Sequence, residues 1–353
     1  MKIEQKRIKI ICIVGTRPQF IKHAAIEQCD HLDMEFITVH TSQHYDDDMS
    51  DVFFKQLDIK TPKYQLINEN KANSQEHNEY MLKKLNEIFF NEQPTAVLVY
   101  GDTDSTLAGA RAAEQLQLPV IHVEAGLRSY NEAMQEEINR VKTDQISTLL
   151  LVPNETARLN LEREGISGSG IVIVGDVMKD VIGKRNTMSK NQKSTYHYAT
   201  LHRPYNVDEE RRLVYILDTL NTLNQKVILS IHPRTKSRIL AFGLDLDKFE
   251  NINFIGPQSY FDNLNLMAGS TSIITDSGGM QKEAYWLEKP CVTLRPETEW
   301  RETLVNQCNI LIYENLEKLE ELIQRPFGPF DPDLYGDGCA AQKIIESIYN
   351  RFQ

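Results

Sequence analysis

The alternation of short apolar runs with longer amphipathic segments constrains the fold of this chain more than any other feature. Runs such as Ile8–Val14, Ala96–Tyr100 and Val120–Val123 are typical of strands buried on both faces, as in a parallel sheet. Segments with helical periodicity, such as residues 73–90 and 105–115, lie between them. Strands that alternate with helices in this way predict parallel βαβ units with right-handed crossovers.

The alternation stops at a polar segment, residues 184–194 (KRNTMSKNQKS), and then restarts. We therefore predict an α/β protein with two doubly wound, Rossmann-like domains, residues 1–180 and 181–335. An amphipathic run at residues 339–349 predicts a C-terminal helix, within residues 336–353, that packs back on the first domain. Ligands bind beyond the carboxyl ends of the strands in such sheets, so we expect the active site in the cleft between the domains. The other predicted strands are 36–39, Leu149–Val152, 171–174, Tyr196–Leu201, 227–231, Ile252–Ile255, 272–275 and 291–294.

Composition excludes several classes of function. The formal net charge of −11 argues against nucleic acid or an anionic membrane as a partner, because both attract a basic surface. The five cysteines are scattered without a CxxC pair, so neither a disulfide scaffold nor a zinc site is expected. No apolar run approaches the roughly 18 residues of a membrane span, and we expect a cytoplasmic protein.

Acidic residues follow two of the predicted strands of the first domain. Asp102 comes directly after one strand, Glu124 after another, and Glu136 follows in the next segment. The carboxyl ends of parallel strands meet at one edge of a sheet, so these carboxylates are candidates for acid–base chemistry. His122 and Glu124 would share one face of a strand, which leaves a metal site open as an alternative. A solvated loop is the other alternative.

Two strand-to-helix turns are candidates for binding an anion. The first is Gly15-Thr16-Arg17-Pro18, where Pro18 suits the first helical turn and Arg17 and Lys22 add positive charge. The amide groups of such a turn attract phosphate, although a tight turn would explain the glycine equally well. The second is Ser277-Gly278-Gly279, with Glu283 one helical turn later, where it could accept hydrogen bonds from a ribose diol. A tight turn explains these glycines but not the whole set.

Histidine and arginine pairs follow two predicted strands of the second domain, at His202-Arg203 and at His232-Pro233-Arg234. Both pairs could donate hydrogen bonds to a diphosphate. The glycines at 165, 168 and 170 precede a predicted strand, whereas a dinucleotide fingerprint must follow one and open a helix. We therefore reject a nicotinamide-binding interpretation.

Six segments occur in the same order as the motifs of one known family. These are GTRP, GDTDS, HVEAGLR, EEINR, LHRPYN and TDSGGMQKEA, and together they resemble the non-hydrolysing UDP-N-acetylglucosamine 2-epimerases over nearly the whole chain. The resemblance implies a glycosyltransferase-B-like fold, a homodimer, a UDP-sugar substrate and neither a cofactor nor a metal. It implies catalytic roles for Asp102, Glu124, Glu136 and His202. It implies substrate binding by Arg17, Lys22, Gln43, His44, Arg140, His232, Gln258, Ser277, Gly278, Gly279 and Glu283.

Two positions depart from the family pattern. A family arginine falls on Trp300, in RPETEW, and a family aromatic near the uracil falls on Asn263. These departures leave the reaction class unchanged and the exact sugar open. The segments RPETEW and SQHYDDDMSDVFF together resemble the branch that acts on modified sugars such as UDP-2,3-diacetamido-glucuronate. The expected reaction inverts C2 by eliminating UDP to a 2-acetamidoglucal and adding it back, in a route that supplies surface polysaccharide. A glycosyltransferase, a hydrolysing epimerase and a non-catalytic sensor of UDP-sugars remain as alternatives.

Overall fold

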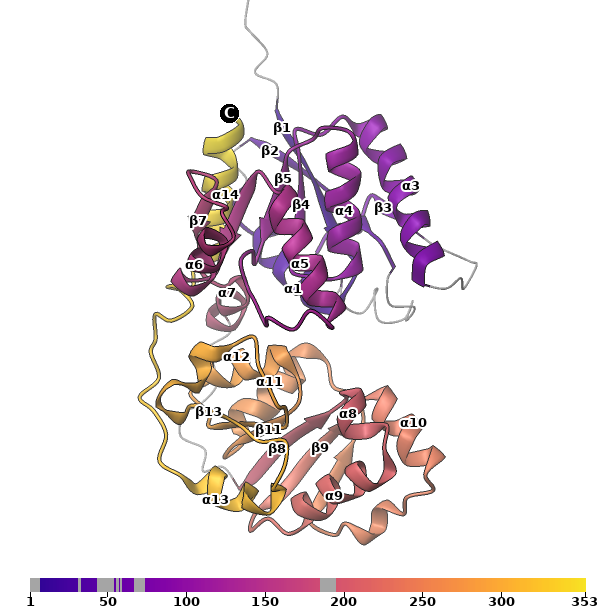
Figure 1. Cartoon of the computed structure of the whole chain (residues 1–353), viewed down its shortest axis with the longest axis vertical. Helices are drawn as coiled ribbons and strands as arrows, with labels where there is room; N and C mark the ends of the chain where they lie inside the picture. Colours follow the sequence, from indigo (N-terminus) through magenta and orange to yellow (C-terminus); the bar gives the residue numbers. More distant parts are fainter. Residues whose placement is uncertain are drawn as a thin grey trace, which may run out of the picture. The chain divides into compact units, whose positions relative to one another are not determined.

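The computed structural model describes residues 7–30, 33–42, 54, 57, 59–66, 74–184 and 195–353. The chain forms two compact units (Figure 1). The first unit contains Met1–Lys184 and Asp333–Gln353, and the second contains Arg185–Pro332. Gln43 and His44 lie outside the described residues.

A parallel sheet forms the centre of the first unit, and the described residues supply it with seven strands. The strand order is β3-β2-β1-β4-β5-β6-β7, so the winding direction reverses between β1 and β4. The strands are β1 (Ile8–Val14), β2 (Met34–His40), β3 (Tyr64–Gln65), β4 (Ala96–Tyr100), β5 (Val120–Val123), β6 (Leu149–Val152) and β7 (Ile171–Ile173).

Two groups of helices pack within this unit. Helix α4 packs between α3 and α5, while α14 packs against α1 and α7. Right-handed crossovers from both sides of the reversal place the two groups on opposite faces of the sheet. The sheet is therefore covered on both faces, which explains why its strands are continuous apolar runs. The helices are α1 (Arg17–Glu27), α3 (Ser74–Glu92), α4 (Asp104–Gln115), α5 (Gln135–Ile146), α6 (Glu155–Arg163), α7 (Val177–Lys184) and α14 (Ala340–Phe352).

The C-terminal helix α14 belongs to the first unit, where Figure 1 shows it in yellow. The carboxylate of Asp180 accepts hydrogen bonds from the backbone N–H groups of Ala340 (3.0 Å) and Ala341 (2.7 Å), which satisfies the exposed start of this helix. The backbone N–H of Asp176 also donates to the carbonyl of Tyr335 at 2.9 Å. The first unit extends past the predicted boundary at residue 180, because α7 continues to Lys184.

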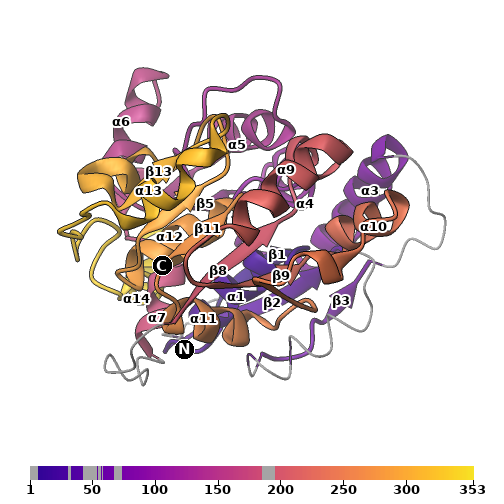
Figure 2. The ribbon, with the colours of Figure 1, turned by 90° about the horizontal axis from the view of Figure 1, so that it is seen from below.

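The second unit has a second parallel sheet, for which the described residues supply six strands in the order β10-β9-β8-β11-β12-β13. Its winding reverses between β8 and β11, and Figure 2 shows β8 beside β9. The strands are β8 (Tyr196–Leu201), β9 (Lys226–Ile231), β10 (Ile252–Ile255), β11 (Ile273–Thr275), β12 (Cys291–Thr293) and β13 (Asn309–Leu311). The helices are α8 (Pro204–Val207), α9 (Glu210–Asn221), α10 (Pro233–Ala241), α11 (Tyr260–Gly269), α12 (Gly278–Trp286) and α13 (Leu319–Gln324), with 3-10 turns at Leu246–Lys248, Arg301–Gln307 and Leu316–Lys318.

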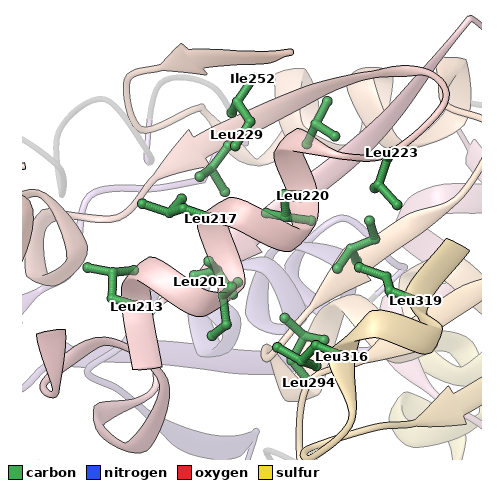
Figure 3. Close-up of a cluster of buried hydrophobic side chains, with 14 of the residues drawn as sticks. Leu201, Leu213, Leu217, Leu220, Leu223, Leu229, Ile252, Leu294, Leu316 and Leu319 are labelled. Atoms are coloured by element: carbon green, nitrogen blue, oxygen red, sulfur yellow. The ribbon is translucent and has the colours of Figure 1, made fainter. Parts of the chain in front are cut away.

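A leucine-rich core holds the second unit together (Figure 3). Leu213, Leu217 and Leu220 lie on one face of α9, at the spacing that puts side chains on one helical stripe, and all three are buried. They pack with Leu229 of β9 and with Leu316. In the described parts of the chain, no helix is both long and apolar enough to cross a membrane.

Candidate active site

The side chain of Gln19 joins two turns at the carboxyl edge of the first sheet. Its Oε1 accepts hydrogen bonds from the backbone N–H groups of Gly15 (2.8 Å) and Thr16 (3.1 Å). Its Nε2 donates to the Tyr100 carbonyl (2.8 Å) and the Thr106 hydroxyl (2.9 Å). The turn after β1 is thereby held against the turn after β4, at the reversal point where open α/β sheets bind ligands.

These bonds correct one expectation about the Gly15-Thr16-Arg17 turn. The N–H groups of Gly15 and Thr16 donate to Gln19, so they are not directed at an anion as predicted. A Cβ atom on Gly15 would lie 2.2 Å from the hydroxyl oxygens of Thr41 and Ser105, and this close packing explains the glycine. The turn offers positive charge through Arg17, which begins α1, and Lys22.

Two of the predicted catalytic carboxylates pair with predicted substrate-binding cations. Glu124 forms an ion pair with Lys22, and Asp102 forms one with Arg140. A Cβ atom on Gly101 would lie 3.5 Å from Glu124 Oε2 and 3.7 Å from Lys22 Nζ, so the first pair lies directly beside the turn that carries Asp102. The structure thus brings these four predicted residues into one cluster at the edge of the sheet.

The backbone at Glu124 adopts a left-handed conformation with φ of +70°, which is uncommon for a residue other than glycine and often marks a functional site. The backbone N–H groups of Glu124 and Ala125 both donate to the Leu151 carbonyl, at 3.0 and 3.2 Å. This sharp turn corrects the expectation that His122 and Glu124 share one strand face, because β5 ends at Val123.

Both ring nitrogens of His122 contact protein atoms, whereas a metal ligand needs one nitrogen for the metal. Its Nδ1 lies 2.7 Å from Asp144 Oδ1, and its Nε2 lies 2.7 Å from the Gly101 carbonyl oxygen. Both ring nitrogens are therefore occupied by protein atoms. Among the described residues, no group of three or more His, Cys, Asp or Glu side chains could hold a metal ion.

The neighbouring acids Glu136 and Glu137 differ sharply in environment. Glu137 is buried, and it accepts hydrogen bonds from the backbone N–H groups of Ser129 (3.0 Å) and Tyr130 (2.9 Å) and from Arg140 (2.8 Å). It therefore fixes the loop after β5 to the start of α5. Glu136 is partly exposed in the same first turn, and it stays the predicted catalytic residue of the two.

Helix α5 is bonded to the turn that carries Asp102. The side chain of Asn139 donates to the backbone carbonyl of Asp102 (3.1 Å) and to the carboxylate of Asp104 (3.0 Å). Asn139 is adjacent in sequence to Arg140, and Glu136 lies one helical turn before Arg140. Helix α5 therefore presents Glu136 near the same edge of the sheet.

A buried aspartate organises the corresponding edge of the second unit. Asp276 follows β11 and accepts hydrogen bonds from the backbone N–H groups of His202 and Arg203 and from the Asn206 amide, at 3.0 to 3.1 Å. Burial alone would raise the pKa of Asp276, but its bonds to His202, Arg203 and Asn206 outweigh this effect and lower it. The carboxylate is therefore ionised and fixes the turn after β8. We did not predict Asp276, although its position directly before Ser277-Gly278-Gly279 is a signal in the sequence.

The structure brings the two predicted histidines of the second unit together. The ring centroids of His202 and His232 lie 5.2 Å apart. His202 Nδ1 lies 3.0 Å from the buried Asp276 carboxylate. His232 Nδ1 accepts the backbone N–H of Arg234 at 3.2 Å, so the neutral ring of His232 carries its proton on Nε2. This arrangement suits hydrogen bonding to an anion.

The Ser277-Gly278-Gly279 turn opens α12 as predicted, with Ser277 at the N-cap. A Cβ atom on Gly278 would lie 2.4 Å from Glu299 Oε1, whereas one on Gly279 would meet nothing within 4 Å. Glu299 is paired with the buried Arg295 at 3.0 Å. A carboxylate therefore lies near the positive end of α12, and sequence reasoning missed both Glu299 and Arg295.

The remaining predicted positions of the second unit lie on or near α11 and α12. Glu283 is buried within α12, and Gln258 Nε2 donates to the Gly256 carbonyl at 2.8 Å just before α11. Asn263 accepts a hydrogen bond from the Tyr198 hydroxyl at 2.7 Å. Trp300 is buried, with the Lys282 ammonium 3.7 Å from its ring centroid, a favourable cation–π contact. Both positions that depart from the family pattern thus pack inside the second unit.

Each unit therefore places ionisable side chains at the winding reversal of a doubly wound sheet, the arrangement of a two-domain α/β enzyme. A lipopolysaccharide outer core galactosyltransferase shares this fold with a TM-score of 0.53 at 12% identity, over 98% of this chain and 95% of its own. The predicted fold class, two Rossmann-like domains of glycosyltransferase-B type, is confirmed. A family model described as UDP-N-acetylglucosamine 2-epimerase matches residues 26–349, and the chain belongs to that family.

Individual relatives are similar to this chain over nearly its full length. A UDP-N-acetylglucosamine 2-epimerase homolog of Methanococcus maripaludis is 43% identical, covering 97% of this chain and 100% of its own. The UDP-2,3-diacetamido-2,3-dideoxy-D-glucuronate 2-epimerase of Pseudomonas aeruginosa is 40% identical, covering 97% and 99%. The crystal structure of the Methanocaldococcus jannaschii UDP-GlcNAc 2-epimerase in complex with UDP-GlcNAc and UDP has a TM-score of 0.87 at 36% identity, covering 97% and 100%. The predicted enzyme class, an epimerase and hence an isomerase, is confirmed.

Proposed function

We propose that this protein inverts C2 of a UDP-2-acetamido sugar by eliminating UDP and adding it back. The observation that carries the proposal is the cluster at the edge of the first sheet, where Glu124 pairs with Lys22 and Asp102 pairs with Arg140. Carboxylates held at fixed positions beside cations can exchange protons with a bound sugar.

The chemistry of the substrate explains why carboxylates are needed. The proton at C2 of a 2-acetamido sugar is not adjacent to a carbonyl, so a side-chain base cannot remove it directly. When UDP departs, C1 takes on oxocarbenium character and the C2 proton becomes acidic. One carboxylate then removes this proton to give a 2-acetamidoglucal, and a second group protonates the opposite face. We propose Asp102, Glu124 and Glu136 for these two steps.

The second unit supplies groups suited to the departing diphosphate of the same substrate. His202 and His232 lie together, and the start of α12 offers a helix N-terminus to negative charge. Donors aimed at a leaving group stabilise the charge that develops on it in the transition state. We therefore propose that His202, His232 and the Ser277-Gly278-Gly279 turn hold the diphosphate, and that Glu283 binds the ribose.

The sugar itself is one of two candidates. The relatives include enzymes named for UDP-N-acetylglucosamine and one named for UDP-2,3-diacetamido-2,3-dideoxy-D-glucuronate. The segment RPETEW, which ends at Trp300, favours the modified sugar. We further propose that the enzyme works in the cytoplasm and supplies surface polysaccharide synthesis. We also propose that it is a homodimer, which light scattering on the purified protein tests.

Incubation with each UDP-sugar in deuterated water, followed by NMR, tests the reaction. We expect the C2 epimer to form with deuterium at C2, and the preferred substrate to turn over fastest. Epimerisation without deuterium at C2 would contradict the elimination mechanism. Accumulation of free UDP and free sugar would indicate a hydrolysing enzyme, and transfer to an added acceptor would indicate a glycosyltransferase.

A further inference from the structure

His122 lies in β5, beneath the carboxylate cluster of the first unit, and its side chain is fully buried. Its two ring nitrogens reach in different directions. Nδ1 lies 2.7 Å from Asp144 Oδ1 on α5, and Nε2 lies 2.7 Å from the carbonyl oxygen of Gly101, the residue before Asp102. Each distance is that of a strong hydrogen bond.

Both of these partners accept hydrogen bonds. A backbone carbonyl has no proton to donate, and neither does an ionised carboxylate. A neutral imidazole has one N–H and one lone pair, so one of its nitrogens would face an acceptor at 2.7 Å without a proton between them. Both contacts are satisfied together when the ring of His122 carries two protons, as an imidazolium.

The surroundings of Asp144 keep its carboxylate ionised. Its second oxygen accepts hydrogen bonds from the Gly126 N–H at 3.1 Å and from Arg128 Nη1 at 2.7 Å. Burial alone would raise the pKa of Asp144, but His122 and Arg128 outweigh this effect and lower it. The Gly126 and Arg128 donors alone favour the charged form of this carboxylate, and this geometry assigns the proton between Asp144 and His122 to the histidine.

The imidazolium is coupled to the proposed catalytic groups through Gly101. This residue has φ of +64°, and it lies beside both Glu124 and Lys22. Asp144 of α5, which also pairs with Arg128, contacts His122 directly. Glu124 and Lys22 lie beside Gly101, the residue whose carbonyl His122 contacts. Arg128 is itself held by Glu164 at 2.6 and 2.7 Å.

We propose that His122 is a positioning residue for the epimerisation, a buried imidazolium that holds the Gly101 carbonyl and keeps the neighbouring carboxylates ionised. It fixes the turn that carries Asp102 and adds positive charge next to Glu124. A positive neighbour favours the charged form of a carboxylate, which is the form that acts as a base. This role rests on the proposed function, whereas the double protonation of His122 does not.

A second buried histidine of the same unit provides a matched control. His23 Nδ1 lies 2.9 Å from the Tyr100 hydroxyl, and its Nε2 lies 2.8 Å from the Thr38 hydroxyl. A hydroxyl can donate or accept, so a neutral ring satisfies both contacts. Both histidines are fully buried. A carboxylate also lies near His23, but Glu27 Oε2 is 3.9 Å from its Nε2, well beyond the 2.7 Å at which Asp144 contacts His122.

NMR of the imidazole nitrogens tests the charge directly on the substrate-free protein. We expect both nitrogens of His122 to show the shifts of protonated nitrogen at pH 7 and pH 8, with the signals assigned by their loss in His122→Gln. His23, assigned in the same way, should show one protonated nitrogen and one with a lone pair. A lone-pair nitrogen on His122 at pH 7 would overturn the proposal.

Kinetics of His122→Gln, Asp144→Asn and the control His23→Gln test the role in catalysis. We expect the first two variants to lower kcat at least tenfold while KM and the Kd of UDP change less than twofold. The acidic limb of their kcat–pH profiles should move to higher pH, because losing the positive charge raises the pKa of the carboxylate base. His23→Gln should lower Tm but leave kcat and this limb unchanged.

The outcomes separate this inference from the proposed function. Variants that lose Tm alone, with wild-type kcat and an unmoved acidic limb, would show that His122 only supports the fold. Asp144→Asn preserves side-chain volume, so its kinetics, and assignment of the His122 ring signals by the shifts that Asp144→Asn causes, decide the question even when His122→Gln fails to fold. Absence of deuterium at C2 in the wild-type reaction would instead contradict the proposed function and leave the NMR result standing.

Discussion

The winding reversals of the two sheets share one architecture but differ in the charge of the side chain at the centre. In the first unit, neutral Gln19 joins the turns after β1 and β4. In the second unit, ionised Asp276 joins the turns after β8 and β11. Because the Gln19 amide is neutral, it does not compete for the cations that pair with Glu124 and Asp102. In the second unit, the Asp276 carboxylate lies 3.0 Å from His202 Nδ1 and orients that ring beside His232, which suits this edge to binding an anion.

This comparison predicts that losing a carboxylate in the first unit affects turnover more than binding. Glu124→Gln should lower kcat by about 10²–10⁴, the usual contribution of a general acid–base group, and change the Kd of UDP less than threefold. Steady-state kinetics and calorimetric titration of UDP measure the two effects. Glu132→Gln, at an exposed position in the following loop, is the control and should keep wild-type kcat. Equal losses of kcat and UDP affinity for Glu124→Gln would place Glu124 in binding or folding.

Removing the charge of Asp276 in the second unit should affect UDP binding more than turnover. Asp276→Asn keeps the shape of the side chain but removes its charge, so His202 and the turn after β8 lose a charge-assisted acceptor. Such a bond contributes about 1.5–3 kcal/mol, and we expect the Kd of UDP to rise about tenfold or more. A variant that loses kcat while UDP affinity is unchanged would contradict the assignment of the second unit to the diphosphate.

Acid should destabilise the protein through buried carboxylates in both units. The pKa values of Asp144 and Asp276 are lowered from 3.8 in the folded protein, so their stabilising effect is present above this value and is lost as pH falls toward the folded pKa. Urea unfolding at about pH 5, 4 and 3 should show a free energy of unfolding that falls mainly below about pH 4, where the carboxyl groups of the unfolded chain take up protons. Asp144→Asn and Asp276→Asn should each flatten this dependence, and an unchanged slope in either variant would contradict the lowered pKa.

The two glycines of the α12 turn should respond differently to the same small change. Gly278→Ala places a methyl group against the Glu299 carboxylate, whereas Gly279→Ala enters open space. The end of a glutamate side chain can move, so we expect only a two- to fivefold loss of UDP affinity for Gly278→Ala. Gly279→Ala meets no protein atom within 4 Å, so a loss of UDP affinity in this variant would report close approach of the diphosphate to the backbone. Equal, wild-type affinities in both variants would argue against this turn as a phosphate site.

Hydrophobic periodicity predicted most of the fold because each buried strand carries its own local signal. The bounds of β1, β4, β5, β6, β8 and β10 agree with the predicted runs. The strands β3 and β13 were missed, and the two residues of β3 are too few to show a period. The roles predicted for the site residues remain predictions, and Gln43 and His44 lie outside the described residues.

The sequence by itself determined the two doubly wound sheets, the turns at their carboxyl edges and the family of the chain, because apolar periodicity and motif order are local properties. Only the tertiary structure decided how those turns are held. Gln19 and Asp276 act through partners more than 70 residues away, and His122 acts through a backbone carbonyl in the turn after the neighbouring strand β4. A hydrogen bond depends on distance and direction in space, and neither is encoded in the spacing of residues along the chain.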